Sequence, residues 1–120
     1  GVILFAHGSR DPRWAEPFGR LAERVAAADG APPVAIAYLD FMTPDLPGAV
    51  RALAALGCDA VTIVPAFLGV GGHVRRDVPA IVEAIAREHP GMTLRVAAAL
   101  GEEASVQDAM ARASLAAAKG

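Results

Sequence analysis

The chain has little of several residue types on which common structural and binding devices depend. It has a single cysteine, Cys58, among 120 residues, which excludes an intrachain disulfide and a thiolate metal cluster. Aromatic residues make up 5% of the sequence, too few for the stacking platform that binds single-stranded nucleic acid. Because a lone cysteine fits a reducing compartment, we expect a cytoplasmic protein.

The sequence also lacks a large excess of either charge sign and a long apolar run. The 11 basic and 13 acidic residues give a formal net charge of −2, which argues against nucleic acid as the main partner. The apolar run at 2–6 is too short to span a membrane and lacks the charged flank of a signal peptide, so we expect no membrane association. With 54% hydrophobic residues, the chain has ample material for one core, and we expect a single domain over 1–120.

Four short apolar runs are each followed by a longer amphipathic segment. The runs lie at 2–6, 34–39, 60–67 and 93–100, and the amphipathic segments at about 12–28, 44–56, 75–88 and 102–118. Continuous apolar residues are typical of strands in a parallel sheet that helices cover on both faces. The pattern predicts a three-layer, flavodoxin-like α/β domain with a four-stranded parallel sheet in the order 2-1-3-4.

Proline positions indicate where the first two helices begin. Two dipeptides combine an N-cap residue with a proline suited to the first helical turn, namely Asp11-Pro12 and Thr43-Pro44. Pro17 would remove a hydrogen bond inside a helix. We therefore expect the first helix to begin irregularly or near Ala15.

Three potential metal ligands follow neighbouring strands of the predicted sheet. His7 follows the first strand, Asp40 the second, and His73 closes a glycine-rich loop after the third. In open parallel sheets ligands bind beyond the carboxyl ends of the strands, where the strand order reverses, and here that point lies between strands one and three. Two imidazoles and a carboxylate suit a divalent ion such as cobalt, nickel, iron or zinc.

Other roles remain open for these residues. Either imidazole could act as a base near neutral pH, or each histidine could be a hydrogen-bonded structural residue. Asp40 could simply cap a turn. His89, at the predicted end of a helix, is expected to be structural, because a cation there favours the helix dipole.

The loop 69-GVGGH-73 has two functional interpretations. Gly71 and Gly72 could let backbone amides approach an anion at the next helix N-terminus, or they could fold the chain back to place His73 over the sheet edge. A flexible surface loop is the third possibility. In the second interpretation an apolar wall beside the site comprises Phe67, Leu68 and Val70.

Arginines near the same edge favour an anionic ligand. Arg75 and Arg76 fall in the first turn of the third predicted helix, where cations oppose the helix dipole. Their position is better explained by a nearby anion. Arg10 should reach the same edge and add a third guanidinium suited to carboxylates.

Two motifs together resemble the class II tetrapyrrole chelatases, specifically the small CbiX-like family of sirohydrochlorin cobaltochelatases. They are 4-LFAHGSRDP-12 and 64-VPAFLGVGGHVRRDVP-79. The resemblance implies a chelatase-like fold and the insertion of cobalt, or of iron or nickel in relatives, into sirohydrochlorin on the way to cobalamin or sirohaem. It also implies that the divalent metal is a substrate and that no organic cofactor is needed.

The resemblance also implies roles for individual residues. His7 and His73 match the two metal-handling histidines, and Asp40 replaces the family's glutamate after the second strand. The arginines would bind the carboxylates of the tetrapyrrole. The macrocycle would lie on the wall from Phe67 to Val70, together with Phe41 and Met42. A homodimer is implied, because a flat macrocycle needs two walls and one lobe supplies one. The alternative is a non-catalytic metal- or tetrapyrrole-binding protein.

Overall fold

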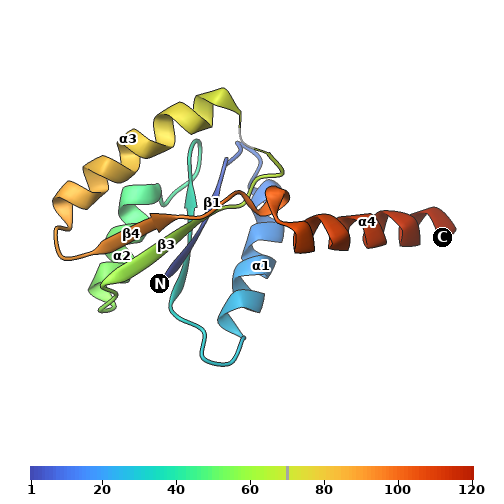
Figure 1. Ribbon diagram of the computed structural model, residues 1–120, viewed down its shortest axis with the longest axis horizontal. Helices are drawn as coiled ribbons and strands as arrows, with labels where there is room; N and C mark the ends of the chain where they lie inside the picture. Colours follow the sequence, from blue (N-terminus) through green and yellow to red (C-terminus); the bar gives the residue numbers. More distant parts are fainter. Residues whose placement is uncertain (70) are drawn as a thin grey trace.

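A parallel four-stranded sheet forms the middle of the molecule (Figure 1). The structure is a computed structural model that describes residues 1–69 and 71–120, and for residue 73 the backbone alone. The strands are β1 (Val2–Ala6), β2 (Val34–Tyr38), β3 (Ala60–Pro65) and β4 (Thr93–Val96). They pair in the order β2-β1-β3-β4, which confirms the predicted topology.

Helices lie on both faces of the sheet, as the sequence predicts (Figure 1). Four α-helices alternate with the strands: α1 (Glu16–Ala26), α2 (Leu46–Ala55), α3 (Gly72–Glu88) and α4 (Ala104–Lys119). Two short 3₁₀ helices, η1 (Pro12–Ala15) and η2 (Leu100–Glu102), precede α1 and α4. Helices α2 and α3 contact each other on one face, α1 packs on the other face, and α4 extends away from the body.

The main core lies between the sheet and the pair α2 and α3. Alternate strand residues point to this side, and Ile3, Phe5 and Ile63 are buried there against Leu53 of α2 and Ile85 of α3. Burying a large aliphatic or aromatic side chain contributes about 1.5–3 kcal/mol. This core therefore holds β1, one of the two inner strands of the sheet, and sets where its carboxyl end lies.

The predicted start of the first helix is confirmed, and that of the second is wrong. Asp11 caps η1 by accepting a hydrogen bond from the Arg13 N–H at 3.0 Å, and α1 follows at Glu16, near the expected Ala15. Helix α2 begins two residues later than Pro44, because Asp45 caps it through the Gly48 N–H at 2.9 Å. Its first-turn proline is Pro47, and the Thr43-Pro44 peptide bond is cis.

Other boundaries shift by a few residues. The later strands end before the predicted 39, 67 and 100. Helix α3 begins at Gly72 instead of residue 75, because the Gly71 carbonyl already accepts the Arg75 N–H at 3.1 Å. Within the described residues, no helix has the length and apolar character needed to cross a membrane.

Candidate functional site

His7 stands at the carboxyl end of the central strand. The parallel ladder between β1 and β2 continues past both strands, since the Leu39 N–H donates to the Ala6 carbonyl and the Asp40 N–H to the His7 carbonyl, both at 2.9 Å. On the other side the Ala66 N–H donates to the Phe5 carbonyl at 2.7 Å. The backbone of His7 therefore belongs to the sheet, while its side chain is exposed.

The His7 imidazole lies over the ring of Phe67. The two ring centroids are 4.2 Å apart and the planes are inclined by 31°. Phe67 is 6% exposed and contacts the Phe5 ring in turn, with the centroids 6.0 Å apart. Within the described part of the chain, no hydrogen bond to the His7 side chain is present. Aromatic packing therefore orients this imidazole and leaves its nitrogens without protein partners there.

The contact with His7 leaves Phe67 largely unavailable to the predicted apolar wall. Phe67 has little surface left for a ligand, because it supports His7 from below. Leu68 is 74% exposed and fits the predicted wall, whereas Val70 lies outside the described residues. Aromatic residues can pack against imidazole and cover a ligand equally well, so the sequence alone could not separate these two roles for Phe67.

A close backbone contact joins the turn after β1 to the turn after β2. Gly8 has φ +91°, and a Cβ at this position would lie far inside van der Waals contact with the Asp40 carbonyl oxygen. Glycine is therefore required for both its conformation and its lack of side chain. The contact holds Asp40 beside His7, and the Asp40 side chain is exposed.

The structure describes the side chains of only two of the three predicted metal ligands. His7 and Asp40 lie on neighbouring strand ends, and His73 lies in the first turn of α3, but the His73 side chain is outside the described residues. Among the side chains that the structure describes, no three His, Cys, Asp or Glu residues gather closely enough to hold a metal ion. The triad therefore stays a prediction.

A cavity of about 450 Å³ opens between the turns after β1 and β2. Arg10 lies at this cavity with its guanidinium carbon 4.9 Å from the centre of the Phe41 ring, a cation–π contact. Phe41 is 65% exposed and has φ +69°. A bulky side chain rarely adopts that conformation, and such residues cluster at functional sites.

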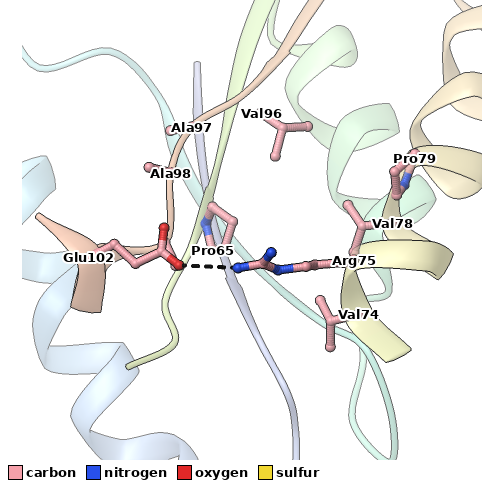
Figure 2. A pocket seen from close by; sticks show the side chains of 10 residues that line it. Pro65, Val74, Arg75, Val78, Pro79, Val96, Ala97, Ala98 and Glu102 are labelled. Atoms are coloured by element: carbon pink, nitrogen blue, oxygen red, sulfur yellow. Dashed lines mark ion pairs between the residues drawn. The ribbon is translucent and has the colours of Figure 1, made fainter. Parts of the chain in front are cut away.

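A second cavity, of about 270 Å³, opens between α3 and the ends of β3 and β4 (Figure 2). Pro65, Val78 and Val96 give it apolar walls. Arg75 and Glu102 extend toward each other beside it and form an ion pair, with Nη2 and Oε1 3.9 Å apart. The two side chains are 68% and 46% exposed, so the pair contributes little to stability.

The remaining predicted residues of this loop adopt ordinary conformations. Arg76 donates from Nε to the Gly72 carbonyl at 3.2 Å. Gly71 has φ −73° and is the N-cap residue of α3, and at both Gly71 and Gly72 an added Cβ would have no described atom within 4 Å. Among the described residues, therefore, no close backbone approach requires these two glycines. Glu102 was missed, because nothing in the sequence links it to a residue 27 positions earlier.

One carboxyl group supports the turn after β1. The side chain of Arg13 hydrogen-bonds Asp11 at 3.0 and 3.2 Å, and this contact, followed by the Arg13 backbone N–H, lowers the Asp11 pKa from its ordinary 3.8. The Asp11 N–H donates to the Ser9 hydroxyl at 3.1 Å. These bonds stabilise the turn that carries Arg10.

Comparison with known proteins agrees with this arrangement. The sequence model of the CbiX family matches residues 1–117. The chain belongs to the CbiX family. A solved structure of a putative cobalamin biosynthesis CbiX protein from Marinobacter aquaeolei is 37% identical, with a TM-score of 0.85, and the match covers 98% of this chain and 96% of that one.

Curated relatives of this CbiX-family chain carry one name. The sirohydrochlorin cobaltochelatase of Methanothermobacter thermautotrophicus is 34% identical over 68% of this chain and 57% of its own length. That of Methanocaldococcus jannaschii is 35% identical over 73% and 62%. The chain thus spans about 60% of the length of these relatives.

A more distant structure shows the same fold. The sirohydrochlorin chelatase SirB of Bacillus subtilis, solved in complex with cobalt, has a TM-score of 0.74 at 21% identity. The match covers 82% of this chain and 42% of SirB. At this identity the likeness concerns the fold of the CbiX-family chain and not its site.

Proposed function

We propose that this chain inserts a divalent metal ion, cobalt in the first place and iron or nickel as alternatives, into a sirohydrochlorin-type tetrapyrrole. The metal ion is a substrate in this reaction, and no organic cofactor takes part. The names of the curated relatives support the substrate. The observation that carries the proposal is the exposed His7 imidazole, oriented by Phe67 at the carboxyl end of the central strand.

The reaction needs a metal ligand that releases its ion and a group that accepts protons. One divalent ion enters the macrocycle as two pyrrole N–H protons leave, so the charge is conserved. A neutral imidazole can bind a first-row ion through one nitrogen, and it titrates near neutral pH. We assign these two tasks to His7 and His73, with Asp40 as a further metal ligand.

Side chains around His7 match the remaining surface of such a substrate. The tetrapyrrole carries carboxylates, for which Arg10, Arg75 and Arg76 are suitable partners. Phe41 and Leu68, exposed by 65% and 74%, follow the strands on either side of β1 and offer apolar contact to a flat ring. The Arg75 side chain would then leave its ion pair with Glu102 and bind a carboxylate of the substrate.

A second copy of the chain would supply the other wall of the binding site. A flat macrocycle has two faces, and the residues around His7 cover one of them. We therefore propose a homodimer with isologous contact, in which the same surface serves both copies. The cytoplasmic location expected from the single cysteine stays a prediction.

An absorbance assay tests the reaction. Sirohydrochlorin is mixed with Co²⁺ and the change in its spectrum is followed with the wild type, His7→Ala and His73→Ala. We expect each variant to lose about 100-fold or more of the acceleration, as for the loss of a general base. His89→Ala is the matched control, since His89 ends α3 at the opposite edge of the sheet.

The same assay separates the enzyme from a non-catalytic binding protein. If the wild type binds sirohydrochlorin but does not accelerate metal insertion, the chelatase proposal fails and the binding protein is favoured. If His89→Ala loses as much rate as His7→Ala, the assignment of His7 fails.

A further inference from the structure

The cavity between α3 and the ends of β3 and β4 lies at the same edge of the sheet as His7. Pro65, which lines the cavity, stands opposite Phe5 of β1, two residues before His7. Arg75, which lines it from the other side, follows His73 by two residues in the first turn of α3. The cavity therefore adjoins the residues to which the proposed function assigns the metal ion.

The size and lining of this cavity suit a substituent of a ligand better than a whole ligand. Its volume of about 270 Å³ lies below the roughly 300–1,000 Å³ of sites that enclose a whole small molecule. Val74 and Val78 are buried in its wall, and Val96 is 43% exposed. Among the described residues that line it, Arg75 and Glu102 alone are charged (Figure 2). A short aliphatic chain that ends in a charged group matches this lining.

The ion pair beside the cavity leaves the Arg75 guanidinium available to a ligand. Its Nη2 lies 3.9 Å from the Glu102 carboxylate oxygen, beyond the roughly 2.7–2.9 Å of a charge-assisted hydrogen bond. The pair of Arg13 and Asp11 is closer, with hydrogen bonds of 3.0 and 3.2 Å. Within the described part of the chain, the Arg75 side chain donates no hydrogen bond. A carboxylate that approaches more closely would therefore gain bonds that Glu102 does not make.

The backbone that carries Glu102 is held in a fixed relation to His7. The preceding Gly101 N–H donates to the Phe67 carbonyl at 2.8 Å, and a Cβ on Gly101 would collide with the backbone of Leu68. The Phe67 ring in turn contacts the His7 imidazole. The Glu102 carboxylate is thus already beside the cavity before any ligand arrives.

We propose that this cavity binds one carboxylate-bearing side chain of the tetrapyrrole, and that Glu102 is a specificity-determining residue that occupies Arg75 until a substrate carboxylate replaces it. This inference rests on the proposed function. A carboxylate on the same chain competes at an effective concentration on the order of millimolar, so Glu102 keeps free small anions from Arg75. A macrocycle held at His7 presents its own carboxylate with the same advantage. An uncharged substituent cannot replace Glu102.

A change of one charge tests the role of Glu102. Metal-free sirohydrochlorin is titrated by fluorescence into the wild type, Glu102→Gln and the matched control Glu103→Gln, which removes the same charge from the next residue. We expect Glu102→Gln to lower the dissociation constant about threefold to tenfold, because a competitor and a like charge are removed. Glu103→Gln should change it by less than about twofold, since its charge lies outside the ion pair. Equal tightening in both variants would overturn the role of Glu102.

The gain should require Arg75 and should extend to free anions. Arg75→Gln should weaken binding by about tenfold, and adding Glu102→Gln to it should then have no effect. Acetate, as the free anion, should displace sirohydrochlorin from Glu102→Gln at about threefold lower concentration than from the wild type. A gain that persists without Arg75, or an unchanged sensitivity to acetate, would overturn the proposed competition.

Filling the cavity tests where the substituent lies. Val96→Phe places a ring in the cavity, and Thr93→Phe places the same ring at the other end of β4 as a control. Val96→Phe should weaken sirohydrochlorin binding by about tenfold, and Thr93→Phe should leave it unchanged. Far-UV circular dichroism checks that both variants fold. Unchanged binding by folded Val96→Phe would overturn the site. Binding of sirohydrochlorin without metal insertion would end the chelatase proposal alone, whereas a wild type that does not bind it would overturn both.

Discussion

The tight contact between Gly8 and Asp40 gives the sharpest test of the turns around His7. In Gly8→Ala the new methyl group meets the Asp40 carbonyl oxygen, and the residue must also keep φ +91°. The left-handed conformation costs an L-residue about 1–2 kcal/mol. Relieving the collision requires the backbone to shift, and we expect a total loss on the order of 3–5 kcal/mol in the free energy of unfolding. That is a large part of the roughly 5–15 kcal/mol that stabilises a domain.

Two other glycines separate the two costs. Gly57 has φ +92° but no described atom within 4 Å of its Cβ position, so Gly57→Ala should cost only the conformational part, about 1–2 kcal/mol. Gly19 lies inside α1 with open space around it, so Gly19→Ala should stabilise the protein by about 0.5–1 kcal/mol. Urea unfolding followed by circular dichroism measures all three. A Gly8→Ala variant no less stable than Gly57→Ala would refute the reasoning.

Three further predictions concern side chains near the site. Phe67→Leu should move the His7 ring protons downfield in the NMR spectrum and slow metal insertion, because the ring beneath the imidazole is lost; an unchanged His7 spectrum would contradict the stacking. Phe41→Gly should raise stability by up to about 1 kcal/mol by relieving the positive φ, and should weaken tetrapyrrole binding in a fluorescence titration. NMR titration should give Asp11 a pKa below 3.8, and Arg13→Ala should raise it. Since the folded-state pKa is lowered, the stabilisation is complete above pH 3.8 and is lost as the pH falls through the lowered value.

Hydrophobic periodicity was sufficient to predict the sheet. Strands buried on both sides are continuously apolar, and their alternation with amphipathic segments leaves few topologies, so the order β2-β1-β3-β4 followed. Helix starts were less certain, because a cap depends on which acceptor reaches the backbone. Asp45 and Thr43 are both suitable N-cap residues and lie two positions apart. The sequence alone does not show which of them caps α2. The outward course of α4 depends on packing at Gly101, which periodicity does not describe.

Only those positions of the site that follow directly from the strand order could be predicted from the sequence. The rule that strand ends meet at one edge brings His7 and Asp40 together. The contact of His7 with Phe67 and the pairing of Arg75 with Glu102 depend on rotamers and on segments far apart in the chain. Residue identity alone specifies neither.

The hydrogen bond from the Asp40 N–H to the His7 carbonyl limits how the histidine can move. Its peptide group is anchored in the same ladder as the strands, so reorientation of the imidazole is confined to rotation about two side-chain bonds. Such rotations take picoseconds to nanoseconds at exposed positions. If His7 is the metal ligand proposed above, it can release an ion by rotating away from the Phe67 ring, without any loop rearranging around it. Under the same proposal, the slow events of the cycle would be the arrival and departure of the macrocycle.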